Sequence, residues 1–450
     1  MRMFVSHLKN QLKELAGHQG FMKYFKNTSW LFGEKVLRLC VGIFVGVWIA
    51  RYLGPEQFGV FSYAQSFVGL FAVTATLGLD GIVVRELIKN KNSTEGIIGT
   101  AFWLKFSGAF ISIILLSIAV NFTSNDNYTN TLFFIIASAT VFQAFNVVDF
   151  YFQSEVLSRY IVYANTISLF LSSIIKIILI LNNADLLSFA WVILFDSLVL
   201  SLGFLYFFLK KARVKIQNIK FQNEIARALL RDSWPLFLSG IVISIYMKID
   251  QVIIKDLLGS KEVGQYAAAT RLSEAWYFIP MVIASSLFPA IISAKNQSEE
   301  LYNSRLQKLY DLMVWMSISI ALPMTFLSDK IVNIVYGSQY DKAGSVLMIH
   351  IWTGIFVFLG VAFSGYLSVE NQTKKAFYRT LLGAILNVIF NYVLIPKYGI
   401  NGSAIATLLG QFFSNYLYDL FDRDLHGQLK MKTMSFFPVH LFKNPSKNNY

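Results

Sequence analysis

Charged residues inside long apolar stretches are the first feature of this sequence that could do chemistry. A charge near the middle of a bilayer costs about 2.5 to 3.5 kcal/mol, so such residues usually face a wet cavity or pair with one another. Guanidinium and ammonium groups bind phosphate oxygens, whereas carboxylates in such positions commonly carry a proton or Na⁺. The candidate phosphate-binding cations are Arg38, Lys105, Lys176, Lys248 and Arg271, and the candidate ion-coupling carboxylates are Glu34, Asp149, Asp196 and Asp250.

Neutral polar residues recur at helical spacing beside these charges. Residues three or four apart share one face of a helix, as do Asn165 and Lys176 with the serines between them. Asn387 and Asn391 form a second such pair, and we expect all three asparagines to line a polar cavity that binds substrate. Ser and Asn also join membrane helices to each other, so contacts between helices remain the alternative.

Two of the charges have an opposite charge one helical turn away. Arg38 lies four residues after Glu34, and Glu274 lies three residues after Arg271. Either spacing permits an ion pair. Arg38 is therefore either a substrate-binding cation or half of a structural pair.

The composition explains why these charges need positioning by membrane helices. The chain has 450 residues, of which 55% are hydrophobic and only 14% charged, and its mean hydropathy is +0.52. A soluble domain carries about a quarter charged residues, so this chain could not cover its own surface with polar groups. The composition predicts a membrane protein.

Twelve segments are apolar over roughly the 20 residues that a spanning helix needs. We therefore predict an all-α polytopic membrane protein with two six-helix lobes. The predicted spans are 29–52, 57–79, 97–120, 131–152, 160–182, 186–209, 233–257, 264–292, 309–328, 343–368, 374–395 and 400–420. The predicted organisation is an N-terminal segment 1–28, an N-lobe 29–209, a basic linker 210–232, a C-lobe 233–420 and a tail 421–450.

Lys and Arg residues predict the orientation. With the N-terminus inside, 27 of the 39 basic residues fall on cytoplasmic segments or at the span ends beside them, and 5 fall on the opposite side. Cytoplasmic loops carry such an excess, so both termini are predicted to be cytoplasmic. The first apolar run has no cleavage pattern of small residues and is expected to be a retained helix.

An internal repeat relates the two lobes. Leu53–Phe61 and Leu258–Tyr266 share the pattern Leu-Gly-x-x-x-apolar-Gly-x-aromatic. Each copy follows the first helix of a six-helix half, which predicts a parallel repeat related by an axis along the membrane normal.

Several motifs resemble one known family over nearly the whole chain. They are Ala50–Gly59, Gly78–Glu86, Lys248–Ala267, Asn387–Asn391 and Ile395–Gly402. The sequence is similar to bacterial polysaccharide-biosynthesis flippases, the Wzx-type O-antigen and repeat-unit translocases of the multidrug/oligosaccharidyl-lipid/polysaccharide (MOP) superfamily.

The resemblance implies a V-shaped, MATE-like protein of the bacterial inner membrane. Its substrate would be an undecaprenyl-diphosphate-linked glycan, moved from the cytoplasmic to the outer leaflet for O-antigen or another surface polysaccharide. Membrane lipid, H⁺ or Na⁺ as coupling ion, and polysaccharide polymerase machinery are the other expected partners. A cation-coupled multidrug antiporter of the same fold is the alternative.

Other classes of function are disfavoured by the residues. The single cysteine, Cys40, and five scattered histidines predict neither a disulfide framework nor a metal site. The chain has no P-loop, and we expect no cofactor. The net charge of +13 is assigned to cytoplasmic loops and not to nucleic-acid binding. Short external loops with few titratable groups argue against a membrane enzyme.

Overall fold

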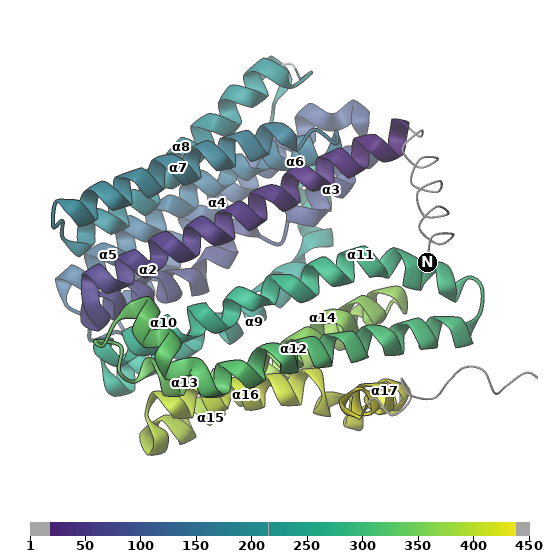
Figure 1. Cartoon of the computed structure of the whole chain (residues 1–450). Helices are drawn as coiled ribbons and strands as arrows, with labels where there is room; N and C mark the ends of the chain where they lie inside the picture. Colours follow the sequence, from purple (N-terminus) through teal and green to yellow (C-terminus); the bar gives the residue numbers. More distant parts are fainter. Residues whose placement is uncertain (1–18, 215, 438–450) are drawn as a thin grey trace, which may run out of the picture. The chain divides into compact units, whose positions relative to one another are not determined.

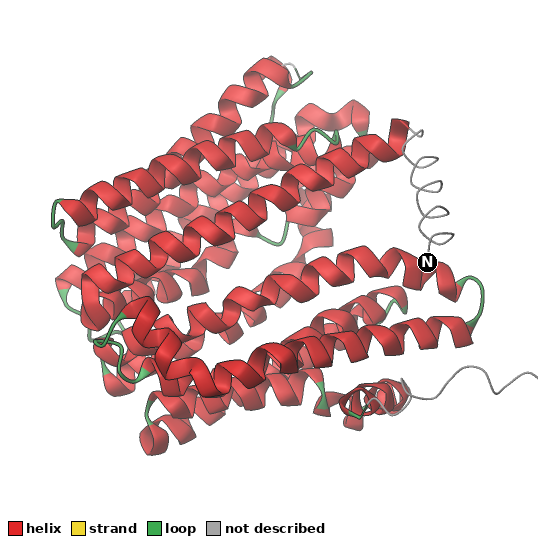
Figure 2. Ribbon diagram, in the orientation of Figure 1, coloured by secondary structure: helices red, strands yellow, loops and turns green. Residues whose placement is uncertain are grey.

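The computed structural model describes residues 19–214 and 216–437, and this part of the chain is helical throughout, with short connections and no strand (Figures 1 and 2). The predicted all-α fold is confirmed. The described α-helices are α2 (Gln19–Thr76), α3 (Asp80–Lys89), α4 (Thr94–Val120), α5 (Asn127–Ser138), α6 (Asn146–Ser154), α7 (Arg159–Leu181), α8 (Leu186–Lys211), α9 (Asn223–Leu258), α10 (Ser260–Glu274), α11 (Phe278–Lys295), α12 (Glu299–Tyr336), α13 (Ala343–His350), α14 (Thr353–Val369), α15 (Thr373–Tyr398), α16 (Ile400–Asn415) and α17 (His426–Phe436).

Ten helical segments of the described chain are long and apolar enough to cross a membrane. The first of them, Lys26–Lys89, contains two of the predicted spans, because α2 continues through a kink at Gly54. The α16 helix has 16 residues and corresponds to the predicted twelfth span. The described helices therefore accommodate the twelve spans that the sequence predicts.

The two copies of the repeat have the same backbone irregularity. Gly54 kinks α2 with φ 69°, and Gly259 separates α9 from α10 with φ 91°. Both angles lie in the left-handed region, which glycine adopts without the steric penalty of a Cβ atom. The first glycine of the repeated pattern thus redirects the chain at equivalent places in both halves.

The chain divides into two compact units, whose bounds differ from the predicted lobes. Among the described residues, one unit contains those up to Tyr52 together with those from Phe67 to Ile241, and the other contains Leu53–Ser66 together with those from Val242 onward. The segment that follows the kink in α2 therefore belongs with the second unit. Residues beyond 209 that we predicted as a separate linker, and the start of α9, belong with the first.

Close packing of the second glycine of each repeat explains why Leu53–Ser66 joins the second unit. A Cβ atom on Gly59 would overlap the backbone of Ser260, and one on Gly264 would overlap the backbone of Pro55. The two helices cross where neither has a side chain, which lets their backbones approach closely. Phe58 is fully buried at this crossing.

The predicted basic linker is folded against the first unit. The α8 helix continues to Lys211 and α9 already begins at Asn223. Gly99 of α4 leaves room for the backbone of Lys220, and the backbone N–H of Gln222 donates to the Thr100 hydroxyl at 3.0 Å. This segment therefore packs on α4.

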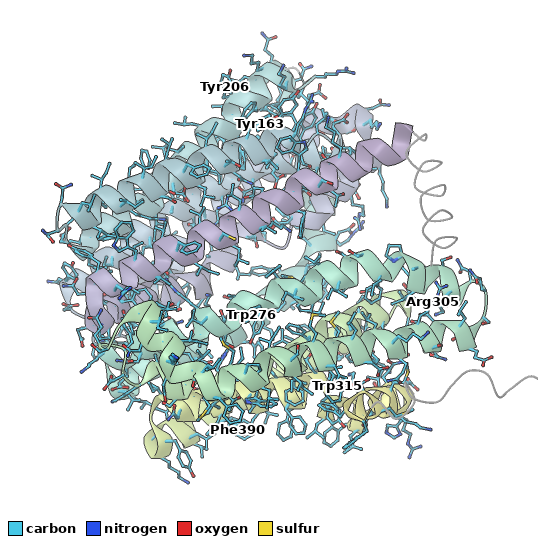
Figure 3. All side chains as sticks on the ribbon, viewed as in Figure 1. Tyr163, Tyr206, Trp276, Arg305, Trp315 and Phe390 are labelled. Atoms are coloured by element: carbon cyan, nitrogen blue, oxygen red, sulfur yellow. The ribbon has the colours of Figure 1, made fainter. Side chains whose placement is uncertain are left out.

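Each unit has its own apolar core, and large apolar side chains also cover the outside. Phe44 is 77% exposed and Phe326 is 80% exposed. Exposed aromatic side chains such as Tyr163 and Trp315 project from their helices in Figure 3. Apolar surface of this extent is expected where helices face lipid.

Candidate functional site

Asp250 is the centre of a buried polar cluster in the second unit. The residue lies on α9 and is 6% exposed. Its Oδ2 accepts hydrogen bonds from the Tyr266 hydroxyl at 2.8 Å and the Thr407 hydroxyl at 2.5 Å, and its Oδ1 accepts one from Asn391 Nδ2 at 2.8 Å. These donors come from α10, α16 and α15. Among the described residues, Asp250 has neutral donors and forms no ion pair.

The two predicted asparagines of α15 contribute to this cluster and not to a group of cations. Asn391 Oδ1 accepts a hydrogen bond from the Ser403 hydroxyl at 2.7 Å. Asn387 is fully buried, and neither its Nδ2 nor its Oδ1 has a hydrogen-bond partner. Buried amides almost always have partners, and the Asn387 side chain lies close enough to Asp250 to interact with its carboxylate.

A small pocket opens beside Asp250 and contains a second carboxylate. Its lining includes Glu274, Gln411 and His350 as well as Asp250 and Thr407. His350 is 2% exposed, and its Nδ1 lies 2.9 Å from the Ser273 hydroxyl. The pocket therefore combines two acids with hydroxyl and amide groups, which suits a cation better than an anion.

The two predicted cations of the second unit have different surroundings. Arg271 packs over the Phe58 ring, 4.6 Å from its centroid, and its Nη2 lies 3.4 Å from Gln65 Oε1. The ion pair that the spacing of Arg271 and Glu274 permits is not formed in the described structure. Lys248 is half-buried on α9, two residues from Asp250, and does not pair with that carboxylate.

In the first unit, Lys105 is buried with its charge neutralised. Its side chain has 0% exposure, and Nζ donates to Asp80 Oδ1 at 2.7 Å. The ammonium also lies 4.8 Å from the centroid of the Phe150 ring. Asp80 is 57% exposed, so this ion pair has a buried ammonium and a carboxylate at the surface.

Two predicted carboxylates of the first unit differ in their partners. Glu34 is 7% exposed and accepts a hydrogen bond from Arg38 Nε at 2.8 Å, so the ion pair permitted by their spacing is present. The Arg38 side chain is 43% exposed and its remaining nitrogens can reach a ligand. Asp149 is half-buried on α6, and its Oδ1 is buried without a hydrogen-bond partner.

The polar stripe on α7 faces α8. Ser168 is 2% exposed and donates to Asp196 Oδ1 at 2.6 Å. Asn165 and Lys176 are half-buried on the same helix. Asp196 therefore receives a hydroxyl donor from the predicted stripe, and the contact joins two helices.

Sequence reasoning missed several residues that the structure adds. Ser403, Thr407 and Gln411 follow one another at four-residue intervals on α16, and this spacing could have identified a polar face opposite Asp250. Arg379 was missed because it lies near the predicted cytoplasmic end of its span, where cations are common. Lys432 was missed because it lies in the predicted tail.

No group of three or more His, Cys, Asp or Glu side chains that could hold a metal ion occurs in residues 19–214 and 216–437.

The arrangement of helices is shared with solved membrane transporters. A multidrug resistance MATE family transporter of the MOP superfamily, in an inward-facing conformation, superimposes with a TM-score of 0.70 at 15% sequence identity, covering 89% of this chain and 96% of that one. The lipid II flippase MurJ superimposes with a TM-score of 0.69 at 15% identity, covering 93% of each chain. The described chain therefore shares the fold of these two solved proteins.

Sequence comparison then gives the family. The model of the polysaccharide biosynthesis protein family matches residues 24–295, and the MatE model matches residues 235–393. The chain belongs to the polysaccharide biosynthesis protein family.

Relatives with similar sequences carry related names. A probable low-salt glycan biosynthesis flippase of Haloferax volcanii is 28% identical over 81% of this chain and 76% of its own length. A putative O-antigen transporter of Shigella dysenteriae is 22% identical over 80% of this chain and 89% of its own length. The resemblance seen in the sequence motifs is confirmed at the level of the family.

Proposed function

We propose that the protein is a flippase that moves undecaprenyl-diphosphate-linked oligosaccharide units from the cytoplasmic to the outer leaflet of a bacterial inner membrane. The observation that carries this proposal is the match to the polysaccharide biosynthesis family over residues 24–295. The names of the relatives and the fold shared with the lipid II flippase support a lipid-linked glycan as the substrate class. Polysaccharide polymerase machinery would consume the product.

The diphosphate linker needs cations that a ligand can reach. Lys105 has no exposed surface and Arg271 is packed over an aromatic ring, so their contacts favour positioning roles. Arg38, Lys176 and Lys248 are partly exposed and are the better candidates for charge-assisted hydrogen bonds to phosphate oxygens. Alternating access would then carry the glycan across while its lipid tail stays in the membrane.

Coupling to a cation is proposed at Asp250. Carboxylate, amide and hydroxyl oxygens are ligands that suit a hard cation such as Na⁺, and Asp250, Asn387 and Thr407 supply one of each kind. The fully buried side chain of Asn387 lies beside this carboxylate. A proton bound to Asp250 would neutralise the carboxylate as a bound Na⁺ would, so H⁺ and Na⁺ are the two candidate coupling ions.

A cation-coupled drug antiporter is the second candidate function. The specific observations that favour it are the MatE match over residues 235–393 and the TM-score of 0.70 with a multidrug transporter. The acidic pocket beside Asp250 would fit an organic cation. The two functions differ in the charge of the substrate, so they can be separated directly.

The test is a gene deletion followed by analysis of glycans. We expect loss of one surface polysaccharide, with lipid-linked repeat units accumulating in the cytoplasmic leaflet, and recovery with the intact gene but not with the Asp250→Asn variant. Surface polysaccharide that persists together with increased drug sensitivity would favour the antiporter and contradict the flippase.

A further inference from the structure

A continuous row of buried polar side chains lies between α15 and α16. On α15, Arg379, Asn387 and Asn391 are separated by multiples of four residues and therefore lie on one face of the helix. The facing residues of α16 are Ser403, Thr407, Gln411, Ser414 and Asn415. All eight are at most 8% exposed. We call this row the α15–α16 seam.

Small residues hold the two helices close along the seam. A Cβ atom on Gly383 would lie 2.7 Å from the Ser414 Cβ, and one on Gly410 would lie 3.1 Å from the Asn387 Cβ. This approach leaves no space for apolar side chains between the helices. The polar groups of the seam must therefore find partners within it or bind a ligand.

Hydrogen bonds run along the seam with one interruption. At one end the Asp250 carboxylate accepts hydrogen bonds from Asn391 and Thr407, as described above. Further along, Asn415 Nδ2 donates to Gln411 Oε1 at 2.5 Å, and Arg379 Nη1 donates to Asn415 Oδ1 at 2.9 Å. Asn387 lies between these two sets with its amide unpartnered. The interruption is adjacent to the proposed cation site.

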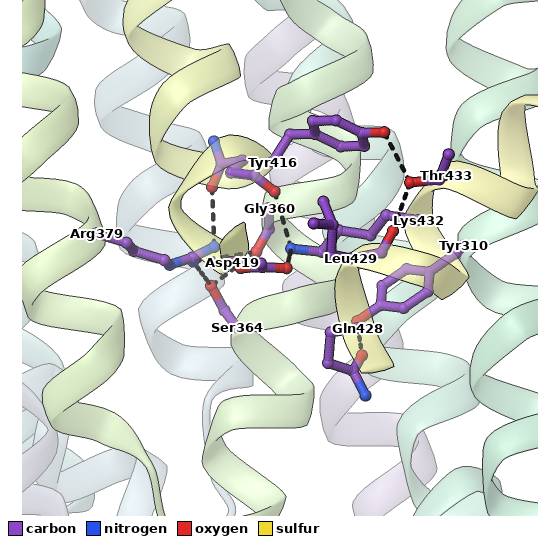
Figure 4. Close-up of polar contacts among 11 residues, drawn as sticks. Tyr310, Gly360, Ser364, Arg379, Tyr416, Asp419, Gln428, Leu429, Lys432 and Thr433 are labelled. Atoms are coloured by element: carbon purple, nitrogen blue, oxygen red, sulfur yellow. Dashed lines mark hydrogen bonds and ion pairs between the residues drawn. The ribbon is translucent and has the colours of Figure 1, made fainter. Parts of the chain in front are cut away.

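The other end of the seam is occupied by a buried guanidinium. Arg379 is 5% exposed, and its Nη2 donates to the Ser364 hydroxyl at 2.5 Å and lies 3.3 Å from the Gly360 carbonyl oxygen (Figure 4). All three of its hydrogen-bond acceptors are neutral. Its neighbour Asp419 is already paired with another cation.

That second cation comes from the C-terminal helix. Lys432 of α17 has 0% exposure, and Nζ donates to Asp419 Oδ2 at 2.6 Å and to the Asn415 carbonyl oxygen at 2.9 Å (Figure 4). Its ammonium also lies 3.3 Å from the centroid of the Phe363 ring. Asp419 and Lys432 neutralise each other, so the cluster of Arg379, Asp419 and Lys432 has a net charge of +1.

We propose that this buried cationic cluster is an electrostatic barrier that keeps the coupling cation from leaking along the α15–α16 seam to the predicted cytoplasmic side. The proposal rests on the proposed cation coupling at Asp250. In a coupled transporter the ion must not cross the membrane without the substrate. Without a barrier, the polar groups of the seam could conduct the ion from Asp250 to the end of the helix. The C-terminal helix thereby acquires a role in coupling.

Distance and charge make such a barrier effective. Arg379 and Asn387 are eight residues apart on α15, which is about 12 Å at 1.5 Å per residue. At an effective dielectric constant of about 20, a fixed positive charge at that distance lowers the occupancy of a univalent cation about tenfold. The effect depends on the net charge of the cluster more than on its shape.

The test measures efflux of ²²Na⁺ and, separately, of H⁺ from liposomes that contain the purified full chain and no glycan substrate, at pH 6. We expect Arg379→Met and Lys432→Met, which both reduce the cluster to zero net charge, to leak about tenfold faster than the unaltered protein. The double variant Asp419→Asn with Lys432→Met keeps +1 and is expected to be as tight as the unaltered protein. Arg379→Lys is expected to be tight for the same reason, and Lys374→Gln removes an exposed cation from the same helix as a control.

Two results would overturn the proposal. In variants that remain monodisperse with unchanged helicity, efflux equal to that of the unaltered protein would show that the seam does not conduct without the charge. Equal leak in Lys432→Met and in the double variant would show that packing, and not charge, closes the seam. If Arg379→Met does not fold, the Lys432 pair of variants gives the same decision.

The proposed coupling fails by a different measurement. Glycan transport that does not depend on Na⁺ or pH gradients would reject coupling at Asp250, whereas the efflux rates alone decide whether the barrier exists.

A pH series gives a second measurement of the barrier, because burial and the nearby Arg379 lower the pKa of Lys432 to about 7, against the opposing effect of Asp419. The titratable groups that face α17 from α12 are Tyr310, which donates to Gln428 Oε1 at 2.7 Å, and the buried Asp311, which accepts from the Gln307 amide that also donates to α17. Loss of the Lys432 proton above pH 7 should increase efflux of ²²Na⁺ from the unaltered protein. The Arg379→Lys variant carries the same charge and should show the same increase. If efflux rises in neither protein, the charge of the cluster does not control the leak.

Discussion

The two units differ in how one buried charge of the predicted site is partnered. In the first unit a fully buried cation, Lys105, is paired with Asp80, which is 57% exposed. In the second unit a buried carboxylate, Asp250, receives hydrogen bonds from neutral groups only among the described residues. The Lys105 charge is therefore neutralised by a carboxylate, whereas the Asp250 charge is met by neutral donors only.

The difference indicates which charge can change its partner. The Lys105 ammonium already has a carboxylate at 2.7 Å and an aromatic ring, so a further ligand would have to displace one of them. Asp250 has no cation, and its hydroxyl and amide neighbours can rotate to present oxygens to one. The first cluster is suited to holding helices together, and the second to binding and releasing an ion.

The largest expected effect follows from removing the charge of Asp250. Asp250→Asn keeps the size and hydrogen-bonding capacity of the side chain but cannot exchange a proton or balance Na⁺. We expect the variant to insert and to bind substrate, while gradient-driven transport in proteoliposomes falls to background.

The double variant Asp250→Asn with Lys248→Ala tests whether Asp250 serves only to neutralise Lys248. Since Lys248 does not pair with Asp250 in the structure, we expect no recovery. Transport restored in the double variant would remove both residues from the functional site.

The next effect concerns the stability of the first cluster. Asp80→Asn leaves the Lys105 ammonium buried without a counter-charge, and because Asp80 is 57% exposed we expect a loss below the roughly 3 to 5 kcal/mol of a fully buried pair. Lys105→Met leaves Asp80 free to be hydrated at the surface and fills the space with an apolar chain, so we expect a loss of at most about 1 kcal/mol. Thermal unfolding in detergent should show the larger decrease for Asp80→Asn. The opposite order would mean that Lys105 is not a structural cation.

How far the sequence predicts these features depends on the kind of interaction. Apolar length and the Lys and Arg distribution predict the helices, because membrane insertion is decided by local composition. The four-residue spacing of Glu34 and Arg38 predicts their contact, since both residues lie on one helix. The fold and the local pairs could therefore be predicted.

Contacts between distant helices could not be predicted in the same way. Asp250 is joined to Thr407, which lies 157 positions further along the chain, and Lys432 reaches Asp419 from a segment that looked like a polar tail. Arg271 could pair with Glu274 by spacing, but packing placed it on Phe58 instead. Partner choice in these cases depends on how helices pack, which a single sequence does not specify.

The shared frame predicts matched effects in the two repeats. Gly59→Ala and Gly264→Ala each place a methyl group against the backbone of the opposite helix, so we expect each to cost about 1 to 3 kcal/mol. Thermal unfolding of the two variants should give similar decreases, and Gly42→Ala is the control because a Cβ there meets no other atom within 4 Å. A large effect in one repeat alone would contradict a reciprocal crossing.

The smallest expected effect separates a substrate cation from a structural one at Arg38. Arg38→Lys keeps the charge and can still pair with Glu34, but it loses the planar fork that holds two phosphate oxygens at once. An ion pair of this i, i+4 kind contributes about 0.3 to 0.5 kcal/mol, so the thermal unfolding temperature should hardly change. If Arg38 grips the diphosphate, the apparent KM for the lipid-linked glycan should rise about three- to tenfold, which corresponds to losing one charge-assisted hydrogen bond. Glu34→Gln is the matched variant, because it breaks the same pair while leaving the guanidinium intact and should not raise KM. Equal changes of KM in both variants would instead assign Arg38 to positioning helix α2.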